Sequence, residues 1–448
     1  MSTDRHRVAV IGGGWAGCAA AVALADAGID VTLFEAAADL GGRARRVWRH
    51  GFALDNGQHL MLGAYRATRE LLARIHERPP VRWRPLAMLP FAHDQPGALT
   101  LAAWRLPAPF NLLMAILCAR GLRASERLAT LRWFARLRRN GYRCEPSQTV
   151  ATMTSTLPPA VAGRLWHPLC VAALNTPPGR ASAQVFANVL RAAFGEGADG
   201  ADLMIAGGDL GALVGDATRQ WLLARGHEVV LQAPASIVDA RARCVSVDAA
   251  GRPRKFSGAV IAVGPHQLAR ALAPTLVARE GMLAQAVGQV GALDWEPITT
   301  VYLGYTTTIE LPDALIRLDD RPGQWLFARP DIVATAAAKA PALKSVVAVV
   351  LSMHGPHDAL DHRALVAAID AQLRSARASW PPLAWSQVIE EKRATYACTP
   401  DAHRPAAGML VPGVSLAGDY TDDEFPATLE AAVRSGRRAA AALVATLR

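Results

Sequence analysis

Three glycines near the amino terminus have the spacing of a phosphate-binding turn. Residues 12–17 read GGGWAG, which is a G-x-G-x-x-G pattern. In such a turn Gly12 permits a sharp bend, Gly14 lets the backbone approach a pyrophosphate, and Gly17 lets a helix pack closely on a strand. Glycine-rich turns are common, so the flanking elements decide whether this one binds a nucleotide.

The elements around the turn are those of a β-α-β unit. Residues 7–11 read RVAVI, an apolar run typical of a buried parallel strand, and residues 16–27 are alanine-rich and helical. The start of this helix, with Trp15 and Ala16, would direct free N–H groups at phosphates. The next strand ends at Glu35, whose carboxylate can accept hydrogen bonds from both ribose hydroxyls. Together these features predict a dinucleotide site.

The rest of the chain divides into pieces of two kinds. A length of 448 residues is long for one core, so two domains are expected. We predict an α/β, Rossmann-like cofactor domain assembled from residues 1–85, 205–290 and 385–448. Residues 86–204, rich in proline, tryptophan and helical stretches, and residues 291–384 would form a discontinuous substrate domain of mixed sheet and helices.

Hydrophobic periodicity predicts the other elements of these pieces. Helices are expected over 209–225, 361–379 and 427–447, and strands over 30–35, 228–232, 258–263, 298–304, 345–353 and 414–417.

The charge distribution bears on possible partners. The formal net charge is +10, and many arginines between residues 120 and 143 alternate with apolar side chains. No nucleic-acid motif accompanies them, so we expect no nucleic-acid partner. The pattern suits a membrane surface, although a solvated helix face explains it equally well. The segment 104–137 is the docking candidate, through apolar side chains beside its arginines, namely Trp104, Phe110, Leu112, Leu113, Met114 and Ile116.

The chain shows no sign of a metal site or a membrane span. The six cysteines form no C-x-x-C pair, which predicts neither a zinc site nor a redox dithiol. The longest uncharged run, 106–119, is too short to cross a bilayer, and no signal peptide is expected before the first strand. We therefore expect a cytoplasmic protein, peripheral on the inner face of the cell membrane.

Two further motifs resemble those of FAD enzymes. Gly41-Gly42-Arg43-Ala44 after the strand-end glutamate resembles the extended signature of the amine oxidase and phytoene desaturase superfamily. The resemblance implies bound FAD, with Gly42 and Arg43 along its pyrophosphate. Residues 416–421 (LAGDYT) and 426–432 (PATLEAA) resemble the closing motif of that superfamily. There Gly418 and Asp419 meet the pyrophosphate and ribityl chain, and the helix start points at the flavin; the cofactor contacts expected in addition are Ala235, Ala427, Thr428 and Leu429.

A narrower resemblance begins at residues 54–65, which read LDNGQHLMLGAY. This segment is similar to the hydroxysqualene dehydroxylases, also called squalene-associated FAD-dependent desaturases, and 168–176 and 181–186 agree. The family implies removal of the hydroxyl of hydroxysqualene to give squalene in hopanoid biosynthesis, by hydride from reduced flavin to an allylic cation. Residues 206–209 (AGGD) depart from the family, where a proline-containing turn is expected.

The resemblance also implies catalytic candidates. Gly57, Gln58 and His59 would lie over the flavin face, where Gln58 and His59 are candidates for catalysis. His59 could protonate the leaving hydroxyl, or it could merely bond a carbonyl or a phosphate. Asp55 could orient this loop or cap a turn. His167 and Asn175 could line a substrate channel, but core packing explains these two residues equally well.

Three other functions compete with this interpretation. A carotenoid desaturase shares the closing motif but not the Asn-Gly-Gln-His stretch at residues 56–59. An amine oxidase usually keeps a lysine near the flavin in its substrate sheet, and no lysine occurs between residues 256 and 338. A flavin-binding scaffold or lipid carrier is the non-enzymatic alternative. The sequence does not indicate the electron donor.

Overall fold

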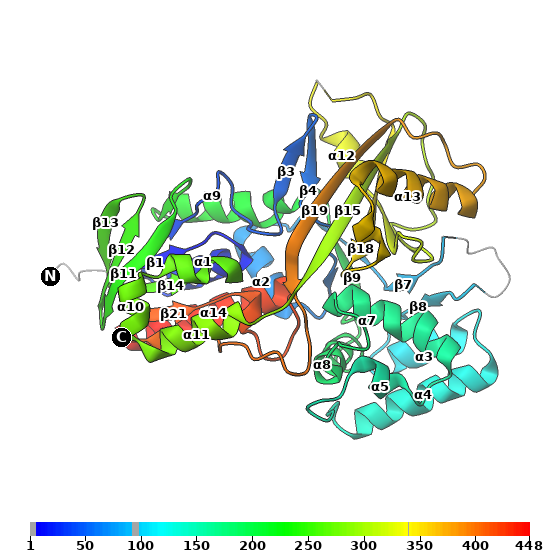
Figure 1. Cartoon of the computed structure of the whole chain (residues 1–448), viewed down its shortest axis with the longest axis horizontal. Helices are drawn as coiled ribbons and strands as arrows, with labels where there is room; N and C mark the ends of the chain where they lie inside the picture. The colour runs from blue at the N-terminus through cyan, green and yellow to red at the C-terminus, as the bar shows by residue number, and fades with distance from the viewer. Residues whose placement is uncertain (1–5, 92–97, 339) are drawn as a thin grey trace.

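The computed structural model describes residues 6–91, 98–338 and 340–448. Within these residues the first layer is a six-stranded sheet, at the left of Figure 1. Its strands are parallel except β20, which pairs antiparallel with β21 at one edge. The spatial order is β10 (Glu228–Val230), β2 (Asp30–Phe34), β1 (Arg7–Ile11), β14 (Gly258–Ile261), β21 (Val414–Leu416) and β20 (Gly408–Val411).

Both faces of this sheet are covered, which explains the continuous apolar run of β1. Side chains alternate between the two faces of a strand. Val8 and Val10 belong to an apolar cluster with helices α1 (Trp15–Asp26), α9 (Ala217–Leu223) and α14 (Leu429–Leu447). On the other face, Ala9 and Ile11 pack against a three-stranded antiparallel sheet. That sheet consists of β11 (Ala235–Arg241), β12 (Cys244–Ala249) and β13 (Arg252–Phe256).

Two glycines set how closely the elements around the first turn approach one another. A Cβ atom on Gly17 would lie 1.8 Å from the carbonyl oxygen of Gly12, so only glycine lets α1 start this close to the turn. A Cβ atom on Gly436 would lie 2.1 Å from the carbonyl oxygen of Ala16. The last helix is therefore docked directly on the backbone of the first.

The second sheet lies at the upper right of Figure 1 and is antiparallel throughout its described strands. Helix α13 (His362–Ala376) covers one of its faces through Leu365, Ile369 and Leu373. The two longest strands, β15 and β19, run out from the first region into this sheet (Figure 1). The order is β16 (Leu315–Arg317), β17 (Trp325–Ala328), β18 (Ser345–Ser352), β15 (Trp295–Tyr305) and β19 (Trp385–Tyr396).

Helices gather beneath this sheet, at the lower right of Figure 1. They are α3 (Phe110–Cys118), α4 (Ala124–Arg139), α5 (Val150–Thr154), α6 (Pro159–Val161), α7 (His167–Leu174) and α8 (Ala183–Phe194). The remaining helices are α2 (Arg66–Ile75), α10 (Pro274–Arg279), α11 (Gly281–Gly291) and α12 (Pro330–Ala334). Short strands complete the fold: β3 (Arg46–Arg49), β4 (Phe52–Asp55), β5 (Met61–Leu62), β6 (Val81–Arg84), β7 (Ala87–Met88), β8 (Leu101–Ala102) and β9 (Leu203–Ala206).

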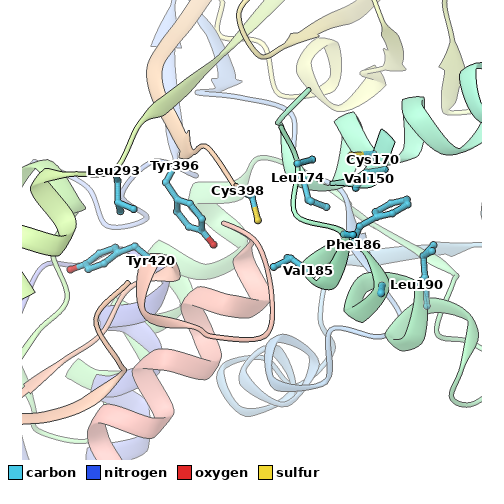
Figure 2. Close-up of a cluster of buried hydrophobic side chains, with 14 of the residues drawn as sticks. Val150, Cys170, Leu174, Val185, Phe186, Leu190, Leu293, Tyr396, Cys398 and Tyr420 are labelled. Carbon is cyan, nitrogen blue, oxygen red and sulfur yellow. The ribbon is translucent and has the colours of Figure 1, made fainter. Parts of the chain in front are cut away.

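One apolar cluster joins the two regions. Figure 2 shows Tyr420 beside the cofactor region, Tyr396 and Cys398 in the middle, and Phe186 and Leu174 on the helices below the second sheet. All five side chains are buried. The two regions therefore share a core instead of meeting at a separable interface.

The helices and strands expected from the sequence are all present, with ends shifted by a few residues. The expected helix over 209–225 begins with a π-helical segment, Gly211–Asp216. Strands β11 to β13 and β19 were not expected. Because β19 pairs with β15, residues 385–396 belong to the second sheet. The division predicted from the sequence had placed these residues in the cofactor domain. The division into two domains otherwise stays a prediction.

One other expectation needs correction. Leu112 and Ile116 do not lie on a docking surface, because they face the core from α3 and are only 2% and 0% exposed. At residues 206–209, where the sequence departs from the family, the Gly207 N–H donates to the carbonyl oxygen of Pro80 at 2.7 Å.

The close docking of α14 on α1 can be tested with Gly436→Leu. A side chain at this position would collide with the α1 backbone, and we expect a loss of about 1–3 kcal/mol in the free energy of unfolding. The measurement is thermal or urea unfolding of the purified protein. Gly288→Ala on α11 is the control, because a Cβ there meets nothing within 4 Å. A Gly436→Leu protein as stable as the control would contradict the docking.

Candidate cofactor and substrate site

A cavity of about 650 Å³ runs along the carboxyl ends of β1 and β2 towards the second sheet. Its wall is built from separate parts of the chain. They include the first turn, the loop after β2, the loop after β4, the segment after β14, residues of α7, β15 and β19, and the carboxy-terminal segment around α14. Of the residues expected to bind the cofactor, those that line it are Gly12, Gly14, Trp15, Ala16, Glu35, Gly42, Arg43, Gly57, Gln58, Gly418, Asp419, Ala427, Thr428 and Leu429.

The first turn leaves room for a ligand at one position. Gly12 has φ +102°, and a Cβ there would lie 2.6 Å from the carbonyl oxygen of Ala262, so the turn depends on glycine. A Cβ on Gly14 would meet only the Cα of Gly42, at 3.8 Å. Helix α1 starts here without a side-chain cap, so its first N–H groups are available to an anion. This wall fits a pyrophosphate.

Glu35 stands at the far end of the cavity and is held by the turn itself. One of its carboxylate oxygens accepts the N–H of Gly13 at 2.7 Å, and the other accepts the N–H of Ala37 at 2.8 Å. A carboxylate oxygen can accept more than one hydrogen bond. Glu35 can therefore bind ribose hydroxyls while it also fixes the loop.

The carboxy-terminal segment closes the opposite wall. The guanidinium of Arg43 pairs with Asp419 and donates to the carbonyl oxygen of Ala394 at 2.7 Å. Helix α14 begins two residues later than expected, and the Thr428 hydroxyl caps it by accepting the N–H of Ala431. The positive end of the helix dipole thus lies at the cavity wall, where it stabilises negative charge.

A second cavity adjoins the first between the second sheet and helices α7 and α8. It is lined by alternate residues of the sheet, such as Trp325 and Phe327 on β17, and by Phe186 and Leu190 on α8. None of the described residues that line it is charged. The two cavities share a wall made by Gln58, Leu60, Tyr65, Ala172, Ala173, Ile298 and Thr428.

A buried polar cluster lies behind this shared wall. Arg329 on the loop before α12 pairs with Asp55 at 2.9 Å and Asp331 at 2.6 Å. It also donates to the side-chain oxygen of Gln58 at 2.8 Å. Burial raises the pKa of Asp55 to about 6, although the charge of Arg329 and the N–H of Leu210, which donates to the carboxylate at 2.8 Å, oppose this shift. Asp55 therefore anchors the loop from behind and does not line either cavity.

His59 lines the cofactor cavity, and its neighbours Gln58 and Leu60 line both cavities. Its Nδ1 lies 2.9 Å from the carbonyl oxygen of Gly57. A carbonyl oxygen only accepts, so Nδ1 carries a proton, and Nε2 has no hydrogen-bond partner among the residues that the structure describes. Burial, and then the charge of Arg43, lower the pKa of His59, while the Gly57 bond raises it. The neutral ring is therefore favoured at pH 7.

Some expected site residues lie elsewhere. Ala235 starts β11 and lines neither cavity. His167 also lines neither, and its Nε2 contacts the Thr154 hydroxyl at 3.1 Å. Asn175 does line the cofactor cavity, but its amide donates to Thr395 Oγ1 and to backbone carbonyls of β15, and its oxygen accepts the N–H of Met353. The contacts of Asn175 therefore join α7 to the second sheet. Gly17 does not line the cofactor cavity and instead allows α1 to pack closely on the first turn.

Several residues of the site were not expected from the sequence. Asn56, His266, Glu391 and Thr395 line the cofactor cavity. Asn56 lies in the segment 54–65, which resembles the dehydroxylases, and its side-chain amide donates to Glu391 at 3.0 Å. Glu391 was not predicted, because the strand that carries it, β19, was not expected. Arg329 carries no motif, so no signal in a single sequence could have found it.

The profile of the family described as flavin containing amine oxidoreductase matches residues 15–444, and the chain belongs to this family. It is an FAD-dependent oxidoreductase. The chain is 28% identical to hydroxysqualene dehydroxylase of Rhodopseudomonas palustris, over 98% of both chains. It is 26% identical to hydroxysqualene dehydroxylase of Zymomonas mobilis, over 96% of this chain and 97% of the other.

A solved structure supports the fold. An oxidoreductase from Methanosarcina mazei superposes with a TM-score of 0.72 at 16% identity, over 96% of this chain and 98% of that one. No helix among the described residues is long and apolar enough to cross a membrane. Nor do these residues include a group of His, Cys, Asp or Glu side chains that could hold a metal ion.

The placement of FAD can be tested with Gly14→Val. A branched side chain at this open position would fill the path of the pyrophosphate, so the purified variant should lack the flavin absorption bands. Glu35→Ala should weaken FAD binding less, because it removes only ribose contacts and two loop bonds. Gly288→Val, on an exposed helix with free space around the Cβ, is the matched control and should stay yellow. Full FAD occupancy in Gly14→Val would refute the placement.

Proposed function

We propose that the chain removes the hydroxyl group of hydroxysqualene and yields squalene, a step of hopanoid biosynthesis. The observation that carries this proposal is the uncharged cavity that adjoins the cofactor cavity. Such a lining suits a long hydrocarbon with a single polar group. The curated relatives that match nearly the full length carry the same activity in their names.

Each part of the site has a task in this reaction. Gly14, Glu35, Arg43 and Asp419 would hold the cofactor, and the start of α14 would stabilise negative charge on it. Reduced FAD supplies the hydride that an allylic cation of the substrate requires. The apolar walls exclude water, which would otherwise trap this cation.

His59 is the proton donor in this proposal. An allylic alcohol loses water once its oxygen is protonated, and an imidazolium Nε2 at the cavity wall can deliver that proton. The lowered pKa of His59 makes the imidazolium a stronger acid but a scarcer one at pH 7. The reaction should therefore depend on the small protonated fraction.

An amine oxidase fits the site less well, and the relatives favour a carotenoid desaturase less. An amine oxidase would bind a cationic or neutral amine, but the substrate cavity offers no carboxylate among its described lining residues. A carotenoid desaturase would suit the apolar cavity equally well. The full-length relatives favour the dehydroxylase over the desaturase. A desaturase oxidises its substrate, so the direction of electron flow separates these two functions.

Anaerobic turnover tests the direction of the chemistry. Photoreduced enzyme mixed with hydroxysqualene should return to the oxidised flavin spectrum and release squalene. The control is the same reduced enzyme with squalene, which should stay reduced. If the oxidised enzyme instead desaturates phytoene or squalene while the reduced enzyme ignores hydroxysqualene, the desaturase assignment replaces this one.

The role of His59 has its own test in the rate of flavin reoxidation. His59→Ala should slow this step by at least about a hundredfold while FAD stays bound. In the wild type the rate should rise as the pH falls through the pKa of His59, which lies below 6.5, because protonation supplies the acid. The variant should lack this rise. His167→Ala, which changes a histidine outside both cavities, should behave as wild type. A wild-type rate in His59→Ala would exclude His59 as the donor.

We also propose that the protein collects its substrate from the inner face of the cell membrane. A C30 hydrocarbon is almost insoluble in water, and apolar side chains stand exposed beside arginines in the 104–137 segment. Trp104, Phe110, Leu117 and Leu128 are 47%, 55%, 43% and 47% exposed. Such a surface suits an anionic bilayer, to which arginines contribute about 1 kcal/mol each.

Sedimentation with anionic liposomes tests the membrane contact. Binding should weaken at high salt, and it should fall when Arg132 and Arg136 on α4 become glutamates. The control reverses Arg219 and Arg252, two exposed arginines outside the 104–137 segment, with the same change in net charge. Equal binding by the two double variants would exclude α4 as the docking surface.

A further inference from the structure

Gln58 is the polar residue of the shared wall whose amide retains an unused donor. It lines both cavities and is half-buried. The other polar side chains of that wall are engaged, because Thr428 caps α14 and donates to Pro426, and the Tyr65 hydroxyl bonds Thr428. What the Gln58 amide presents to the cavities therefore depends on its orientation.

That orientation is fixed by two partners. A guanidinium only donates, so the atom that contacts Arg329 at 2.8 Å must be Oε1 of Gln58. The Nε2 atom then donates to the Tyr302 hydroxyl at 2.7 Å, and that hydroxyl gives its own proton to the carbonyl oxygen of Asp55 at 2.7 Å. Within the described residues, the second N–H of Gln58 donates to no protein atom. It remains for a ligand at the junction.

The partners of Gln58 are themselves immobile. Arg329 is 7% exposed and Tyr302 is 0% exposed. Arg329 is held by Asp55 and Asp331, and Tyr302 also accepts the N–H of Asp55 at 3.2 Å. A donor fixed by such a network needs no reorganisation when a ligand binds.

We infer that Gln58 recognises the hydroxyl oxygen of the polyprenyl alcohol at the junction of the two cavities, and that Arg329 and Tyr302 are positioning residues that aim its free N–H at this oxygen. The inference rests on the proposed function and adds a specificity determinant to it. An alcohol loses hydrogen bonds to water when it enters an apolar cavity, and a fixed donor restores one of them. The hydrocarbon product has no oxygen to bind and leaves more readily.

The test compares two ligands on the oxidised holoenzyme, which does not turn over. Hydroxysqualene and squalene are titrated separately, and binding is followed by the perturbation of the flavin absorption spectrum. In Gln58→Met, which keeps the volume of the side chain but has no donor, the Kd for hydroxysqualene should rise about tenfold. The Kd for squalene should not change, and both titrations use variant protein of measured FAD content.

A second pair of variants tests the positioning residues. Tyr302→Phe removes the hydroxyl that holds the amide nitrogen, so the Kd for hydroxysqualene should rise while the Kd for squalene stays constant. Tyr305→Phe is the matched control on the same strand, because its hydroxyl contacts Trp380 in the core under α13. This control should leave both Kd values unchanged.

The outcomes separate the inference from the proposed function. Unchanged hydroxysqualene binding in Gln58→Met, or an equal loss for both ligands, would overturn the inference while wild-type turnover still supports the function. A wild-type enzyme that binds neither ligand, and whose reduced form does not convert hydroxysqualene, would overturn both. A selective loss for the alcohol in Gln58→Met and Tyr302→Phe would establish the inference.

Discussion

The site depends on the docking of α14 against α1. The first turn alone supplies only one wall of the cofactor cavity, and the facing wall comes from residues 418–432. Gly436 allows the two helices to touch at the backbone of Ala16. This contact brings two helix amino termini to the same cavity, one directed at phosphates and the other at the redox end. This contact places the start of α14 at the cavity wall, while the pairing of β21 with β14 places Gly418 and Asp419.

A second constraint comes from burying charge beside an apolar cavity. Arg329 is buried between the carboxylates of Asp55 and Asp331 and also donates to the amide oxygen of Gln58. Removing one charged partner of such a buried pair typically costs about 3–5 kcal/mol, since the other charge is left unpaired. The cluster also ties the loop after β4 to the second sheet. The position of the residues that separate the two cavities is therefore set by electrostatics as much as by packing.

Local patterns in the sequence have local causes in the structure. Of the predicted cofactor residues, those at positions 12, 14, 35, 418, 419 and 427–429 line the cofactor cavity, and Gly17 lets α1 pack on the first turn. The expected helices and strands were found because their periodicity is strong.

The same reasoning failed where contacts are long-range. Strand β19 carries four consecutive charged residues, 390–393, and no regular alternation of polar and apolar residues, so only its pairing with β15 identifies it. Arg329 meets Gln58 across 271 residues of sequence, and no local pattern announces such a contact. Asn175 lies in a segment that resembles the family, yet its buried amide donates to backbone carbonyls and is not available to a substrate. Proximity of this kind follows from tertiary structure alone.

The placement of β21 has a consequence for biosynthesis of the enzyme. This strand lies between β14 and β20 inside the first sheet, and the cavity wall continues from it to Leu429. A nascent chain that has emerged only as far as the last strand of the second sheet, β19, already contains the parallel strands β10, β2, β1 and β14. It still lacks β21, so the edge of β14 is unpaired and the cavity wall is incomplete. The complete FAD cavity therefore forms only once residues 414–432 have left the ribosome.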